Sequence, residues 1–77
     1  MSKFPQITSQ KLIKTLEKLG FVIIRIKGSH HYLLHSDGRA TVVPFHKGEN
    51  IGIGLLFKIL KDCKLNKEEF LNKYKNS

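Results

Sequence analysis

The chain has 77 residues, with 14 Lys or Arg against 6 Asp or Glu, so its formal net charge at pH 7 is +8. A chain of this length is expected to form a single domain over residues 1–77, and it is too small to enclose a deep substrate cavity. The charge exceeds what solubility requires and favours a polyanion, with nucleic acid preferred over a membrane surface. We expect a cytoplasmic protein without a disulfide, because the sequence shows no apolar leader or membrane-length apolar run and Cys63 is its single cysteine.

The first predicted element is a helix over residues 9–19. Thr8 or Ser9 can cap its start, because a hydroxyl oxygen accepts a hydrogen bond from an early backbone N–H. Gly20 is expected to end it, since glycine adopts the left-handed conformation without strain. The helical spacing is carried by the apolar residues Leu12, Ile13, Leu16 and Leu19.

Three short strands are predicted next, over residues 21–26, 30–35 and 40–43. The first segment is β-branched and too short for a helix. Residues 36–39, Ser-Asp-Gly-Arg, predict a hairpin turn in which Asp-Gly supplies the positive φ angles. Pro44 is expected to stop the third strand, because proline has no N–H for the ladder. The three strands therefore predict an antiparallel meander.

A loop over residues 45–50 leads to a second predicted helix over residues 53–63. Asn66 followed by Glu69 is typical of a capping box and predicts a short third helix, which ends in a fraying tail. The fold class is therefore α+β, a small α-β-β-β-α domain with its helices on one face of a three-stranded antiparallel sheet. This order resembles the double-stranded-RNA-binding fold.

His30 and His31 stand side by side at the start of the second strand, directly after a Gly-Ser turn. Histidine can take or give a proton near neutral pH. Side chains alternate across a strand, so at most one of the two is expected to act as a catalytic base. His30 shares its face with Tyr32, and His46 could approach the same strand end. The alternative for each histidine is a solvated surface residue. Without metal-ligand spacing or nearby carboxylates, no metal site is predicted.

Four segments together carry a resemblance to a known family. They are Arg25-Ile26-Lys27-Gly28-Ser29-His30-His31, then His35-Ser36-Asp37-Gly38-Arg39, then Val42-Val43-Pro44-Phe45-His46, and a helix containing Ile59-Leu60-Lys61. Over about residues 9–71 the chain is similar to the HicA (YcfA-like) toxins of HicAB toxin–antitoxin modules.

The resemblance implies a ribosome-independent mRNA interferase. The histidine of the Gly-Ser-His motif would be catalytic, which is His30 in this chain, with His31 in reserve. The resemblance also implies a HicB-like antitoxin protein as the partner that covers the active site.

We expect a metal-independent endoribonuclease that cleaves single-stranded mRNA and uses no cofactor, because the ribose 2′-OH is an internal nucleophile. The alternatives are a non-catalytic RNA-binding module and a domain that binds only an acidic protein. The residues expected to contact RNA are Arg25, Lys27, Ser29, Arg39, His46 and Lys47.

Overall fold

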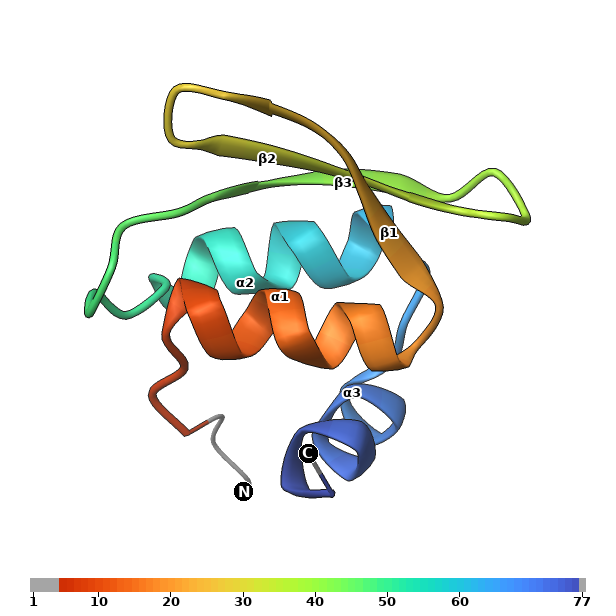
Figure 1. Ribbon diagram of the computed structural model, residues 1–77. Coiled ribbons are helices and arrows are strands. Elements are labelled where there is room, and N and C mark those ends of the chain that lie inside the picture. Colours follow the sequence, from red (N-terminus) through yellow and green to blue (C-terminus); the bar gives the residue numbers. More distant parts are fainter. Residues whose placement is uncertain (1–4, 77) are drawn as a thin grey trace.

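The computed structural model describes residues 5–76, which form three helices and a three-stranded sheet, with the helices on one side of the sheet (Figure 1). The elements in chain order are α1 (Ser9–Lys18), β1 (Phe21–Lys27), β2 (His30–His35), β3 (Ala40–Pro44), α2 (Ile53–Asp62) and α3 (Lys67–Lys75). The predicted α+β class is confirmed. Within the described residues, no helix combines the length and apolar character needed to cross a membrane.

The elements lie in layers. The sheet has the strand order β1-β2-β3 with both pairs antiparallel. Helices α1 and α2 lie side by side beneath one face of this sheet, and α3 packs against α1 on the side away from the strands (Figure 1). No described helix covers the other face, which is called the open face below.

Each strand contributes alternate residues to the two faces. The buried Phe21, Leu33 and Val43 point toward the helices, where they meet Leu12 and Leu16 of α1 in one apolar cluster. The cluster is completed by the buried residues Ile7, Ile13, Leu56, Ile59, Leu60, Cys63 and Phe70. The open face carries Val22, Arg25, Lys27, His30, Tyr32, Leu34, Ala40, Val42 and Pro44, as the pairing register requires.

The strand ends differ slightly from the prediction. β1 extends to Lys27, and a bulge between Ile23 and Arg25 shifts its register against β2. Pro44 is the last residue of β3 instead of the first residue after it. A proline fits there because β3 is an edge strand.

The predicted signals at the helix ends act as expected. Thr8 caps α1 by accepting a hydrogen bond from the Lys11 N–H at 3.1 Å, and Gly20 follows the helix with a φ of +101°. The reciprocal capping box of Asn66 and Glu69 starts α3. This helix continues to Lys75, so it includes the start of the tail over residues 73–77 for which fraying is predicted.

The turn between β2 and β3 is not the one that was predicted. Only Gly38 has a positive φ there, at +98°, because the turn spans more than two residues and closes with the His35 N–H on the Arg39 carbonyl at 2.8 Å. The Asp37 carboxylate accepts a hydrogen bond from the Arg39 N–H at 3.1 Å instead of adopting the left-handed conformation.

Candidate active site

His30 opens β2 on the open face, at the end of the sheet where β1 turns into β2. Gly28 makes this turn possible with a φ of +59°. The Ser29 carbonyl then accepts a hydrogen bond from the Phe45 N–H at 2.6 Å, which ties the start of β2 to the end of β3. The His30 side chain is exposed, and no hydrogen bond or ion pair within the described residues engages its imidazole. Both ring nitrogens are therefore available to a ligand.

His31 points the opposite way, toward the helices. Its ring lies 5.0 Å from the Phe45 ring, centroid to centroid. Its Nδ1 atom is buried and has no hydrogen-bond partner within the described residues. The two neighbouring histidines therefore cannot meet one substrate atom on the open face, as the strand alternation predicts.

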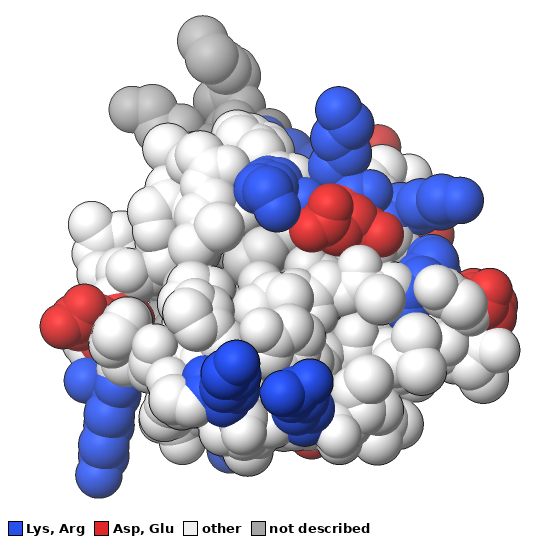
Figure 2. Space-filling model, turned by 90° about the horizontal axis from the view of Figure 1, so that it is seen from above, with Lys and Arg blue, Asp and Glu red and all other residues white. Residues whose placement is uncertain are grey.

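Two of the predicted basic residues stand next to His30 on the open face. Lys27 is its cross-strand neighbour in β1, and Arg25 pairs with Tyr32 one step further along the same strands. Both cationic side chains are exposed. Figure 2 looks onto this side of the molecule and shows Lys and Arg side chains beside a broad uncharged area. A polyanion can place its charged groups against these cations and its flat, weakly polar groups against the uncharged area.

The other edge of the His30 region is the loop that follows β3. His46 and Lys47 are exposed there, just beyond Pro44, which is the cross-strand neighbour of His30. The buried Ser9 anchors this loop, because its hydroxyl donates to the His46 carbonyl at 3.3 Å and accepts from the His46 N–H at 3.2 Å. This role of Ser9 was not predicted from the sequence, since a helix-capping serine has the same local pattern.

A hollow of about 150 Å³ opens beside this loop. Pro44 and His46 form one side and the start of α2 at Gly52 forms another; Ser9, Glu49, Asn50, Ile51 and Leu55 complete the lining. It is smaller than the pockets of about 300–1,000 Å³ that enclose small-molecule ligands. A larger hollow of about 570 Å³ lies along α1, lined by Lys11, Lys14, Glu17 and Lys18, and no predicted site residue reaches it.

Arg39 lies at the other end of the β2–β3 hairpin. Leu34 follows His30 by four positions in β2, and its partner Ala40 adjoins Arg39, so the two ends are about 13 Å apart. The structure therefore does not bring Arg39 together with the residues around His30.

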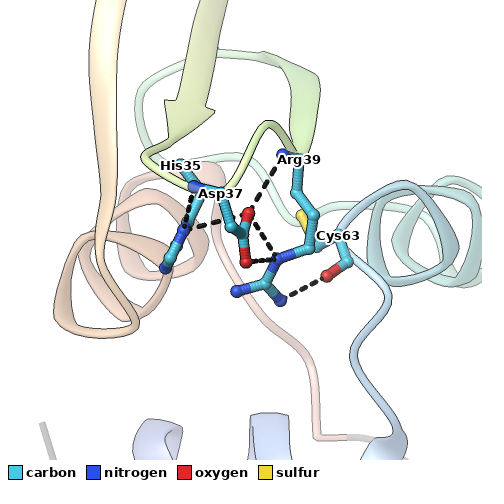
Figure 3. A network of polar contacts seen from close by, with 4 residues as sticks. All are labelled: His35, Asp37, Arg39 and Cys63. Carbon is cyan, nitrogen blue, oxygen red and sulfur yellow. Dashed lines mark hydrogen bonds and ion pairs between the residues drawn. The ribbon is translucent and has the colours of Figure 1, made fainter.

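The guanidinium of Arg39 is engaged inside the protein (Figure 3). Its Nε atom donates to both oxygens of Asp37 at 2.9 and 3.1 Å, and its Nη1 atom donates to the Cys63 carbonyl at 2.7 Å. It also lies 5.2 Å from the centre of the Phe21 ring. These contacts connect the hairpin turn to the end of α2.

Asp37 and His35 complete this network. Hydrogen bonds from the Arg39 side chain and backbone lower the pKa of the Asp37 carboxyl below its ordinary value. The Nδ1 atom of His35 lies 3.1 Å from the Asp37 N–H and 3.1 Å from an Asp37 carboxylate oxygen. A neutral imidazole accepts from the N–H there, whereas a protonated one donates to the carboxylate.

The possible metal ligands and the single cysteine are placed as follows. The described residues contain no group of three His, Cys, Asp or Glu side chains that could hold a metal ion. Burial raises the pKa of the Cys63 thiol to about 12, so the thiolate that a nucleophile requires is scarce at neutral pH. Cys63 is a buried core residue, as the sequence predicted.

Comparison with known proteins agrees with the sequence resemblance. The model of the family described as HicA toxin of bacterial toxin-antitoxin matches residues 9–65 of the chain. The match runs from α1 to just beyond α2, so it includes every predicted site residue. No curated protein matches the chain.

Proposed function

The chain belongs to the HicA toxin family of bacterial toxin–antitoxin modules, and from this premise we propose that it is a metal-independent endoribonuclease in which His30 transfers the proton. The toxin role follows from the family. The reaction, the substrate and the residue roles are our proposal.

The environment of His30 is the observation that carries this proposal. The imidazole is exposed on the open face without a partner inside the described part of the chain, and two cations, Lys27 and Arg25, lie on the same face. A phosphodiester resting against these cations would bring its ribose within reach of the ring. His31 lies on the opposite face, where its ring packs against Phe45 and its Nδ1 atom is buried, which favours His30 as the catalytic residue.

In the proposed reaction the ribose 2′-oxygen attacks the adjacent phosphorus. His30 takes the 2′-OH proton as the new P–O2′ bond forms, and the P–O5′ bond breaks. The leaving 5′-oxygen takes a proton from water, which yields a 2′,3′-cyclic phosphate and a 5′-hydroxyl, and His30 later returns its proton to the solvent. Proton transfer by a positioned histidine contributes typically about 10²–10⁴-fold in rate. Lys27, the cross-strand neighbour of His30, stabilises the negative charge that grows on the phosphoryl oxygens, and Arg25 adds positive charge on the same face.

The remaining predicted residues have more distant roles in this proposal. His46 and Lys47 extend the basic surface past the scissile phosphate on the β3 side. Ser29 holds the start of β2 through its carbonyl. We assign Arg39 to the stability of the fold instead of RNA binding, because Asp37 and Cys63 already occupy its guanidinium.

A toxin of this family has an antitoxin partner, and we propose that the partner here is HicB-like and covers the open face. The uncovered apolar side chains Val22 and Leu34, which are 60% and 38% exposed, lie on the same face as His30 toward its other end and give a protein partner apolar area to bury there.

The test is cleavage of a single-stranded RNA by the purified chain in EDTA, followed by analysis of the product ends. We expect cleavage in EDTA with 2′,3′-cyclic phosphate or 3′-phosphate ends, and loss of cleavage in His30→Ala. The matched control is His31→Ala, compared at equal folded fraction. Cleavage that requires added metal, 3′-hydroxyl ends, or full activity of His30→Ala would contradict the mechanism. Binding without cleavage would favour the RNA-binding module.

A further inference from the structure

Tyr32 is an aromatic residue that the proposed reaction leaves without a role. It follows His30 by two residues in β2 and lies on the same open face. The two Cα atoms are therefore about 7 Å apart. Tyr32 occupies the central strand, is partly exposed, and has no described helix above it.

Arg25 adds a second flat group at this position. It is the cross-strand partner of Tyr32, and its guanidinium carbon lies 5.8 Å from the centre of the Tyr32 ring. The cation is thus positioned against the ring, and Arg25 is exposed while Tyr32 is partly exposed. Single-stranded nucleic acids are bound by such combinations, in which bases stack on aromatic rings and on arginine while cations follow the phosphates.

We propose that Tyr32 and Arg25 form a base-stacking site for the nucleotide next to the phosphate at His30. The inference rests on the proposed function, because it takes the His30 phosphate as its reference point. A base and its own 3′ phosphate are separated by a span similar to that between Tyr32 and His30. The base must leave its partner strand to reach the ring, so the site selects single-stranded RNA. Stacking uses the π-face that every base has, so the selection depends little on sequence.

The chain offers a direct optical test, because it has no tryptophan and two tyrosines. Tyr74 contacts Phe70 and Lys11 near the C-terminal helix, away from the open face. A Tyr74→Phe variant therefore keeps an aromatic ring there and leaves Tyr32 as the only tyrosine emitter. The probe is a 2′-O-methyl oligonucleotide, which cannot be cleaved through its 2′-oxygen. A matched oligonucleotide with abasic nucleotides is the control.

We expect the intact oligonucleotide to quench Tyr32 emission and the abasic one to bind with little quenching. Tyr32→Leu should bind the intact oligonucleotide roughly 5- to 150-fold more weakly, the range that the loss of one stacked base gives. Tyr32→Phe should restore the affinity, and Tyr32→Leu should leave abasic binding unchanged, which a merely structural role would not produce.

Two results would overturn the inference. One is tight binding of the intact oligonucleotide without quenching of Tyr32. The other is equal affinity of the parent and Tyr32→Leu for the intact probe. Either result leaves the proposal that His30 cleaves RNA unaffected. Quenching of Tyr32 in a chain that cleaves no RNA would support the stacking site and refute the nuclease. Absence of any oligonucleotide binding refutes both.

Discussion

Replacing Arg39 by Met should destabilise the fold without weakening RNA binding. Arg39 is the residue for which the sequence and the structure suggest different roles, since its arginine type suggests RNA contact and its position suggests a link between the hairpin turn and α2. Methionine keeps the unbranched apolar stem and removes the guanidinium. The matched variant is Lys27→Met, which removes a cation beside His30 instead.

The size of the effect follows from the contacts that are lost. The Nη1 hydrogen bond to the Cys63 carbonyl is charge-assisted and partly buried, and such bonds contribute about 1.5–3 kcal/mol. The cation over Phe21 adds about 0.5–1 kcal/mol. Contributions of one side chain are not additive, so we expect Arg39→Met to lose about 2 kcal/mol of unfolding free energy. For a domain of this size that lowers the melting temperature by roughly 10 °C.

Urea unfolding followed by far-UV circular dichroism measures the loss, and titration with a single-stranded oligonucleotide measures binding. Lys27→Met should unfold within about 0.5 kcal/mol of the parent, because its side chain is exposed. Lys27→Met should also reduce the slope of the logarithm of RNA affinity against the logarithm of salt concentration by about one. The reasoning is refuted if Arg39→Met unfolds at the parent's urea concentration, or if it loses RNA affinity while remaining fully stable.

The ion pair between Arg39 and Asp37 makes the stability of the fold depend on pH in the acid range. Arg39 lowers the pKa of Asp37 below its ordinary 3.8, so the folded state favours the ionised carboxylate. The stabilisation is therefore complete well above pH 3.8 and is lost as the pH falls through the lower pKa of the folded state. Arg39→Met should show a smaller loss of stability over this acid range than the parent shows.

Three further outcomes are expected. Induced expression of the chain should arrest growth and His30→Ala should relieve the arrest at unchanged stability, whereas an inactive His31→Ala that folds normally would assign catalysis to His31. Gly20→Ala should lower the unfolding free energy by at least about 1 kcal/mol, because its φ is +101° and a Cβ would lie 2.7 Å from Nε2 of His35; a thermal melt equal to that of the parent would disprove this. Cleavage should be far slower on a duplex than on a single strand of the same sequence, and binding should weaken steeply with salt; efficient duplex cleavage would contradict the stacking requirement.

Much of the fold could be predicted because its signals are local. The cap at Thr8, the glycine at position 20 and the Asn66–Glu69 box each act within a few residues, and the structure confirms all three. The strand boundaries were correct to within one residue for the same reason. The turn after β2 was predicted with the wrong geometry, because the Asp37 carboxylate bonds the Arg39 backbone in a turn longer than two residues.

The candidate site could be predicted only in part. Strand alternation separates His30 from His31, and the structure confirms that they face opposite sides of the sheet. Alternation does not indicate which side the helices cover. The burial of Leu33 settles that question and leaves His30 on the open face.

The sequence by itself determined the order of elements, the strand alternation and the excess of positive charge, since each depends on neighbouring residues or on composition. Tertiary structure alone decided how individual cations are used. Arg25 and Arg39 look alike as residues in or beside strands, yet Arg25 lies beside Tyr32 on the open face and Arg39 bonds a carbonyl 24 residues away. The physical reason is that a guanidinium takes whichever acceptors the packed helices bring near it, and the position of the Cys63 carbonyl is set only when α2 packs against the sheet.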